Sequence, residues 1–215
     1  MRAFRFPKSL PSHAGRAVRC GLAAGLALAL LAACAPATRD LAGPVEPLGE
    51  FRLGYNIVNV ENTRKVEPSR NATPEEWQAA FTKAIDDRFG RFDGSQLYHI
   101  GISVDGYSLA VTGVPVVATP QSVAIIRVWL YDDALGGRVN EEPEQISIFE
   151  RLPSEAIVLG SGATQTREEQ MQNIAENGAR LIEVWMRKNP EWFQARPGAE
   201  SNVRIVNNEV VRNDG

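Results

Sequence analysis

The chain has 215 residues, of which 44% are hydrophobic and 23% are charged, and its formal net charge is −3. This length suits one globular domain. Residues 1–33 hold five basic and no acidic side chains, so the remaining 18 basic and 26 acidic side chains give residues 34–215 a net charge of −8. An acidic domain is repelled by phosphate backbones, which excludes nucleic acid as the expected partner.

Residues 1–33 have the three parts of a secretory signal peptide. Residues 21–33 are only Gly, Ala and Leu, and small residues precede Cys34. Thirteen helical residues span about 20 Å, against roughly 30 Å of hydrocarbon in a bilayer, so the run is too short for a transmembrane anchor. The basic part upstream consists of Arg2, Arg5, Lys8, Arg16 and Arg19.

The segment Leu31-Ala32-Ala33-Cys34 resembles the lipobox of bacterial lipoproteins. In that class a signal peptidase cuts before the cysteine, and the cysteine carries lipid. The resemblance implies that Cys34 is the lipid attachment site and that two or three acyl chains, such as palmitate, anchor the chain to a membrane. Each buried methylene contributes about 0.8 kcal/mol, so such an anchor is effectively permanent.

The residues after Cys34 bear on location and on the anchor's connection to the domain. In Gram-negative lipoproteins an aspartate directly after the cysteine commonly signals inner-membrane retention, and Ala35 stands here instead. The resemblance therefore implies the periplasm-facing leaflet of the cell outer membrane. Residues 34–50 hold three prolines and two glycines and predict a flexible tether. Cys20 is removed with the predicted signal peptide, which leaves Cys34 as the single cysteine, so no internal disulfide is expected.

A strand followed by a helix is predicted at the start of the domain. Residues 51–62 have a strand pattern, and residues 62–70 are polar. Thr73 is then the expected N-cap, with Pro74 at the first helical position and Glu76 completing a capping box. Apolar residues follow at helical spacing on one face: Trp77, Ala80, Phe81, Ala84, Ile85 and Phe89.

Residues 96–113 alternate with a period of two, but the apolar parity changes at Asp105-Gly106. A two-residue hairpin at this pair explains the change, since it would place Val104 opposite Tyr107 on one face. A single long strand with a bulge at Gly106 would explain it equally. We favour the hairpin.

The following segment, residues 122–132, is apolar on both faces, which predicts a strand in the middle of a covered sheet. Residues 132–137 read as a turn. Two further strands are predicted at residues 145–152 and 155–162.

A second amphipathic helix is predicted from Thr166, which again forms a capping box with Glu169. Gly178 lies on its apolar stripe, where a missing side chain allows a strand or the first helix to come close. Asn189-Pro190 ends the helix, and Trp192 and Phe193 are expected to pack over its end. The stripe also contains Met171, Ile174, Ala175, Leu181, Ile182 and Trp185.

These elements predict an α+β fold: a two-layer domain with a mainly antiparallel sheet of five to six strands and two amphipathic helices on one face. The expected organisation is a signal peptide at 1–33, a lipidated N-terminus and tether at 34–50, the domain at 51–193, and a polar tail at 194–215 that has the pattern of a short hairpin.

Few residues have the spacing of a catalytic or binding motif. His99 is the one histidine outside the signal, and a general base there would act with Ser103 or Ser108, but no G-x-S-x-G elbow is present. Gly160-Ser161-Gly162 lacks the lysine of a phosphate loop, and Asp132-Asp133 lacks the spacing of a calcium loop. We predict no catalytic, cofactor or metal residues, and no cofactor.

Three hypotheses follow. The first is a non-enzymatic outer-membrane lipoprotein whose periplasmic domain is an accessory or docking subunit of an envelope complex, with the membrane and an envelope protein as partners. The second is a binder of a small or lipidic ligand between sheet and helices. The third is a hydrolase that uses His99.

The lipobox generates a direct prediction. A Cys34→Ala variant keeps the secretory signal but lacks the thiol that receives lipid, so it should lose metabolic labelling with a radioactive or clickable fatty acid. Substitution of Cys20 is the matched control and should leave labelling unchanged. Retained labelling of the Cys34→Ala variant would overturn the assignment.

Overall fold

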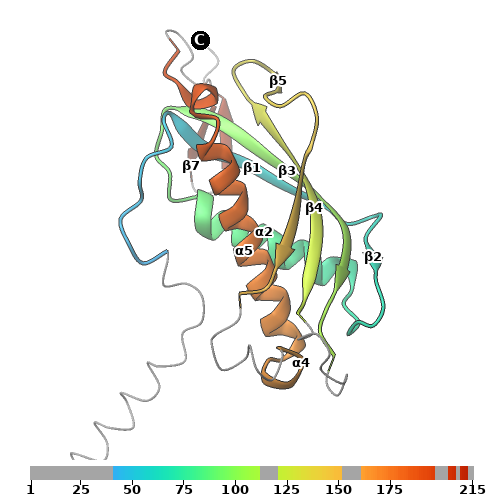
Figure 1. The fold of residues 1–215 in the computed structure, drawn as a ribbon. Coiled ribbons are helices and arrows are strands. Elements are labelled where there is room, and N and C mark those ends of the chain that lie inside the picture. The colour runs from blue at the N-terminus through green and yellow to red at the C-terminus, as the bar shows by residue number, and fades with distance from the viewer. Residues whose placement is uncertain (1–40, 112–120, 152–160, 197–202, 207–208, 213–215) are drawn as a thin grey trace, which may run out of the picture. The chain divides into compact units, whose positions relative to one another are not determined.

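A computed structural model describes residues 41–111, 121–151, 161–196, 203–206 and 209–212 (Figure 1). The predicted signal peptide, Cys34 and most of the predicted strand at 155–162 lie outside the described residues.

The domain contains one six-stranded mixed sheet, which together with two long helices confirms the α+β fold. Its main path runs from β1 (Phe51–Asn59) through β3 (Gln96–Ser108) to β4 (Val123–Asp132). β1 pairs with β3 in parallel, and β3 pairs with β4 antiparallel. The short β2 (Arg64–Lys65) pairs with β3 in parallel, while β5 (Gly137–Arg138) and β6 (Glu144–Phe149) pair antiparallel with opposite ends of β4.

Both predicted capping boxes are present at the helix starts. In α2 (Pro74–Phe89) the Thr73 hydroxyl accepts from the Glu76 N–H, and the Glu76 carboxylate accepts from the Thr73 N–H. In α5 (Arg167–Arg187) Thr166 and Glu169 form the same reciprocal pair. These bonds satisfy amide donors that the first turn leaves without helical partners.

Four shorter elements complete the described chain. Ser161 and Gly162, predicted as the end of a strand, begin the single helical turn α4 (Ser161–Thr164). After α5 comes the 3-10 turn η3 (Pro190–Phe193), in which Phe193 is buried as expected. In the tail, β7 (Val203–Val206) pairs antiparallel with β8 (Glu209–Arg212).

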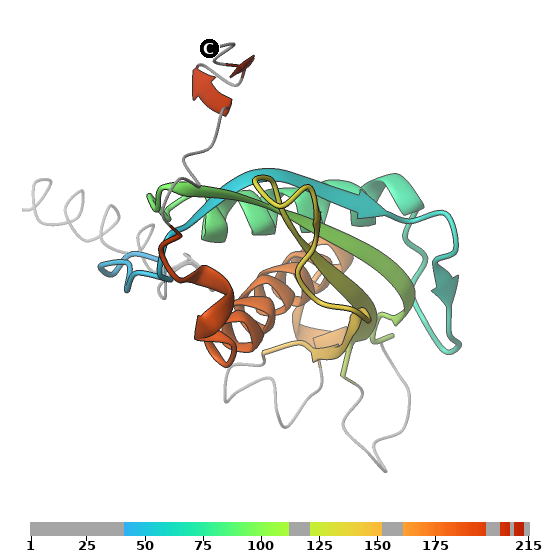
Figure 2. The same cartoon turned by 90° about the horizontal axis from the view of Figure 1, so that it is seen from above.

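The two long helices run in the same direction, as is shown by the ion pairs that join start to start and end to end. Arg167 at the start of α5 binds Glu76 at 2.7 Å, and Arg88 at the end of α2 binds Glu183 at 2.8 Å. Both helices pack on one face of the sheet (Figures 1 and 2). Gly178 permits this close approach as predicted, since a Cβ there would lie 2.8 Å from Ile148 of β6 and 3.0 Å from Phe81 of α2.

Phe51 is the centre of an aromatic cluster in the core. Its ring centroid lies 5.5–5.8 Å from those of Phe89, Phe92, Tyr98 and Phe193. These rings come from β1, the end of α2, β3 and η3, so one buried side chain joins four parts of the chain. Offset and edge-on arrangements of this kind add about 0.5–1.5 kcal/mol per pair beyond area burial.

The predicted hairpin at Asp105-Gly106 is wrong, and the alternative with a bulge is correct. β3 continues through the pair to Ser108, and its register against β4 shifts between Val104 and Gly106. Val104 pairs with Ile126, not with Tyr107. One inserted residue changes the parity as a hairpin would, and the long apolar β4 supplies partners for both halves of β3.

The predicted tether is also too long, since the chain is held to the domain from Gly43 onward. Arg91 donates to the Gly43 carbonyl at 2.7 Å, and Arg187 donates to the Glu46 carbonyl at 2.7 Å. Leu48 is buried. Proline and glycine content predicted flexibility, but arginines far along the chain satisfy these carbonyls. Within the described ranges, no helix is long and apolar enough to cross a membrane.

A close backbone contact at Gly94 generates a stability prediction. A Cβ at Gly94 would lie 2.1 Å from the Glu50 carbonyl carbon, and backbone cannot yield as a flexible side chain can. We expect Gly94→Ala to lower the free energy of unfolding by about 3 kcal/mol in urea titration. Gly43→Ala is the control, since nothing lies within 4 Å of a Cβ there, and equal stabilities of the two variants would contradict the prediction.

Candidate functional site

The face of the sheet that points away from α2 and α5 carries a concentration of exposed apolar side chains. On the helix side, strand residues such as Ile100, Ile126 and Ile148 are buried. On the other side, the exposed large hydrophobic residues of the strands are Tyr55, Ile57, Ile125, Tyr131 and Phe149, with Ile57 66% and Phe149 54% exposed. No other element among the described residues packs over this side, which we call the open face.

The strand register gathers the aromatic residues at one end of the open face. His99 of β3 pairs with Tyr131 of β4, and Gly101 pairs with Trp129. Ile57 of β1 lies beside Gly101 from the other side. The Tyr55 ring tilts over the His99 ring, with 5.1 Å between centroids. We name Tyr55, Ile57, His99, Trp129 and Tyr131 the aromatic patch.

Gly101 allows this patch to be continuous. A Cβ at Gly101 would lie 3.4 Å from the Tyr131 ring and 3.9 Å from the Trp129 Cβ, so the Tyr131 ring covers the backbone at this point. An aromatic ring over a strand glycine shields backbone that would otherwise be bare. The Tyr131 ring therefore occupies the space beside Gly101 that a side chain would otherwise fill.

His99 holds the irregular part of β1 in place. The register of β1 against β3 shifts between Leu53 and Asn56, and the Tyr55 N–H there donates to His99 Nδ1 at 2.9 Å. Since Nδ1 accepts, the ring proton is on Nε2, which lies 3.3 Å from Asp133 Oδ1. Gly54 is needed beside the ring, because a Cβ there would lie 2.5 Å from Nδ1.

A polar belt crosses the open face next to the aromatic patch. Arg127 donates to Asp105 through Nε at 2.6 Å and Nη2 at 2.9 Å, and these hydrogen bonds raise the pKa of Arg127 above its usual range. The guanidinium carbon also lies 5.9 Å from the centre of the Trp129 ring, within cation-π range. Beyond the belt, Ile125 and Phe149 form a smaller apolar area.

The structure does not bring the predicted catalytic partners to His99. Ser103 donates to Asp105 at 3.1 Å, and Ser108 donates to the Pro68 carbonyl at 3.0 Å. Both nitrogens of His99 have partners, so the geometry assigns the ring a positioning role in β1. Asp133 is the carboxylate that faces it.

The other two candidate motifs have structural partners. Asp132 is buried, where it binds Arg196 and accepts from the Leu135 N–H at 3.0 Å, as expected of an aspartate that opens a turn. Gly162 lies against the Val111 backbone, and Gly160 lies outside the described residues. Across the described ranges, no group of three or more potential ligands could hold a metal ion.

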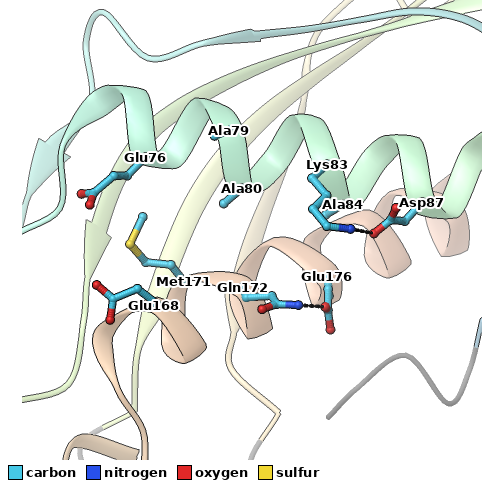
Figure 3. A pocket seen from close by; sticks show the side chains of 10 residues that line it. All are labelled: Glu76, Ala79, Ala80, Lys83, Ala84, Asp87, Glu168, Met171, Gln172 and Glu176. Carbon is cyan, nitrogen blue, oxygen red and sulfur yellow. Dashed lines mark hydrogen bonds and ion pairs between the residues drawn. The ribbon is translucent and has the colours of Figure 1, made fainter. Parts of the chain in front are cut away.

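The ligand hypothesis requires space between sheet and helices, which is where the described hydrophobic core lies. Its side chains include Trp77, Phe81, Ile126 and Ile174, all fully buried. Two hollows lined by described residues lie elsewhere. One of about 450 Å³ lies beside Leu48 and η3, and one of about 350 Å³ lies between α2 and α5 (Figure 3).

The sequence predictions missed the aromatic patch, although two signals pointed to it. β4 is apolar on both sides, with Trp129 and Tyr131 on the side that the helices do not cover. Tyr55 and Ile57 share the same parity in β1, opposite to the buried Val58. The apolar pattern of β4 correctly predicted a central strand. It also predicted a layer over each face of the sheet, and the described residues cover only the helix side.

Comparisons with known proteins identify no family. No family model matches the sequence, and no curated protein matches it. Solved structures with a similar chain path include a candidate lipoprotein from Caulobacter crescentus, at 16% identity over 62% of this chain and 88% of that chain, with a TM-score of 0.34. A TM-score below 0.5 implies nothing about function.

Two further structures belong to the same group of matches, and their TM-scores are also below 0.5. A Xanthomonas campestris protein assigned to DUF330 has 10% identity over 69% of this chain and 93% of that chain, with a TM-score of 0.38. A minor lipoprotein from Acinetobacter baumannii has 10% identity over 64% of this chain and 92% of that chain, with a TM-score of 0.28. Lipoproteins thus occur among the structural neighbours.

The contacts of His99 generate a prediction. His99→Ala removes the acceptor of the Tyr55 N–H and the partner of Asp133, so we expect unfolding in urea to show a loss of about 1–2 kcal/mol. Hydrogen exchange at the Tyr55 amide should accelerate, because its hydrogen bond is gone. Gln145→Ala, an exposed change on the same face, should alter stability by less than about 0.5 kcal/mol. Unchanged exchange at Tyr55 in the His99 variant would contradict the positioning role.

Proposed function

We propose that the chain is an outer-membrane lipoprotein, anchored through Cys34, whose domain docks onto an envelope protein through the open face. The domain acts as an accessory subunit and carries out no chemistry of its own. The lipobox supports the anchor, and the exposed aromatic patch supports the docking.

One observation carries the docking function: large apolar side chains of three strands, Ile57, Tyr131 and Phe149 among them, are exposed together on one face. Single exposed hydrophobic residues are ordinary on protein surfaces, but gathered ones mark places of contact. Full burial of an exposed Ile or Phe contributes about 1.5–3 kcal/mol, so covering this face is favourable.

The composition of the open face favours a protein as the partner. Protein interfaces have an aromatic and apolar centre, are enriched in Tyr, Trp and Arg, and have a polar rim. The aromatic patch supplies the centre, and the Asp105–Arg127 pair lies at its border. Arg127 keeps donors available to a partner, since its side chain is 41% exposed.

Two single substitutions test the docking surface in cells. Ile57→Asp and Phe149→Asp place a charge on the open face at positions exposed enough that folding should tolerate it. After crosslinking of cells that produce an epitope-tagged chain, the wild type should recover one envelope protein in stoichiometric amount. We expect each variant to reduce that recovery at least tenfold, which corresponds to about 1.4 kcal/mol.

Val66→Asp is the matched control, because Val66 is 58% exposed but lies beyond β2 and away from the aromatic patch. Its recovery should equal that of the wild type, and all three variants should still be labelled with fatty acid. Repeated recovery of the wild-type chain as a monomer, or equal recovery with all variants, would refute docking through the open face.

A further inference from the structure

The outer side of β6 is an unpaired strand edge in the part of the chain that the structure describes. β6 pairs with β4 on one side, without a shift in register, and no described strand pairs with its other side. We propose that this edge pairs antiparallel with β6 of a second copy of the chain, which would join the two sheets. The proposal goes beyond docking through the open face and does not depend on it.

The direction of the backbone groups of β6 follows from its contacts with β4. The Glu150 N–H donates to the Ser122 carbonyl at 3.1 Å, so the even-numbered residues of β6 direct their backbone groups toward β4. Neighbouring residues of a strand alternate in this direction. Three residues therefore direct their N–H and C=O groups away from β4: Gln145, Ser147 and Phe149.

One of these outward groups already has a partner. The Phe149 carbonyl accepts from Asn177 Nδ2 of α5 at 2.7 Å, which agrees with its outward direction. Within the described ranges, no hydrogen bond engages the outward groups of Gln145 and Ser147, and both residues are exposed. Two donors and two acceptors at the centre of the edge are thus available to another strand.

The edge of β1, by contrast, is joined to α2 by side-chain hydrogen bonds. Gln78 Nε2 donates to the Val58 carbonyl at 3.4 Å, and Asn56 Nδ2 donates to the Thr82 carbonyl at 3.4 Å. Folded proteins commonly protect exposed edges with charged residues, prolines or bulges. Residues 145–149 have none of these features, which is expected of an edge that pairs with another strand.

The positions of the free groups select one register. When Gln145 lies opposite Ser147 of the second copy, each residue both donates and accepts, and two-fold symmetry repeats the pair, which gives four hydrogen bonds. Phe149 then lies opposite Pro143, which has no N–H, and the Phe149 carbonyl needs none because Asn177 donates to it. A register with Ser147 opposite itself would direct the Gln145 N–H at that occupied carbonyl.

The same register brings opposite charges together beyond the end of the paired segment. By the same count along both chains, Glu141 falls opposite Arg151 of the second copy, and both residues are exposed. Glu142 falls opposite Glu150, but Glu150 is buried. Opposite charges across paired strands stabilise the pairing. The edge is therefore complementary to itself in hydrogen-bond direction, in the position of its proline and in its exposed charges.

The first test uses cysteines at the paired positions. Cys20 is removed with the predicted signal peptide and Cys34 is the predicted acylation site, so the mature chain carries no other free thiol. Gln145→Cys and Ser147→Cys chains with different epitope tags are produced together, and their membranes are oxidised with copper phenanthroline. We expect at least five times more disulfide-linked mixed dimer than linked dimer of either variant alone. Identical positions of the two copies are offset by two residues, beyond the Cα separation of about 7 Å that a disulfide can bridge.

Two controls identify the surface. Val66→Cys replaces Ser147→Cys in the first control, because Val66 is 58% exposed but lies beyond β2, and this pair should give no more linked dimer than Gln145→Cys alone. In the second, Ile57→Asp is added to both cysteine chains and should leave the mixed dimer unchanged. Failure of docking through the open face is therefore distinguishable from failure of the β6 contact.

The second test removes one outward donor. Ser147→Pro lacks an N–H that β4 does not use, so circular dichroism should show a folded domain that no longer pairs. Sedimentation in a non-ionic detergent should show a dimer for the wild type and for Ser147→Ala, and a monomer for Ser147→Pro. Arg151→Glu should weaken the dimer at least threefold, and Glu141→Arg in the same chain should restore it.

Three results would overturn the proposal. The first is no excess of mixed disulfide dimer over the single variants. The second is a dimer that folded Ser147→Pro retains. The third is linkage of Ser147→Cys to another protein in place of a second copy. If Ser147→Pro does not fold, the cysteine pairs alone decide.

Discussion

A sheet with helices on one side buries one of its two faces, and this constraint organises the domain. Both long helices lie on the same side, held in parallel by ion pairs at either end. β4 is central and apolar on both sides, so its helix side is packed while Ile125 and Tyr131 are exposed on the other. Burial of large apolar side chains stabilises a folded protein, so the exposed side chains of β4 do not contribute that free energy to the stability of the domain.

The helix layer shows how the same chain makes a tight contact and a groove. Toward the sheet, Gly178 lets Phe81 and Ile148 meet over α5, and Phe51 ties the end of α2 to η3. Away from the sheet, the helices face each other across alanines, which are too small to close the seam. The Arg167–Glu76 and Arg88–Glu183 pairs hold the helix ends together without filling the space between them.

Local signals in the sequence were sufficient for both helices. Thr73 and Glu76, and Thr166 and Glu169, form capping boxes that depend on residues three apart and on no distant contact. Gly178 was predicted from a similarly local pattern, because a glycine on an apolar stripe indicates that a neighbouring element packs closely against the helix. Fold class followed from the order of elements, and the central position of β4 followed from its two apolar faces.

The errors concern features that depend on distant parts of the chain. A hairpin and a bulge at Asp105-Gly106 change the parity alike, and only the pairing of β3 with β4 distinguishes them. Residues 43–50 have tether composition, yet Arg91 and Arg187 bind their carbonyls. Likewise, an apolar face along β4 does not reveal whether another layer covers it. The composition of a segment indicates its own conformational preference, whereas these three outcomes depend on contacts with residues far away in the sequence.

The two irregularities of the sheet explain why the open face has its composition. The shift in β1 between Leu53 and Asn56 places Tyr55 over His99, and the shift in β3 between Val104 and Gly106 brings Asp105 to Arg127. Bulges commonly redirect side chains near functional sites. At the first shift, Gly54 has no side chain to collide with the His99 ring. At the second, Asp105 accepts two hydrogen bonds from Arg127. The two register shifts thus position side chains of the open face, Tyr55 in one case and Asp105 in the other, and this is the face through which we propose that the domain docks.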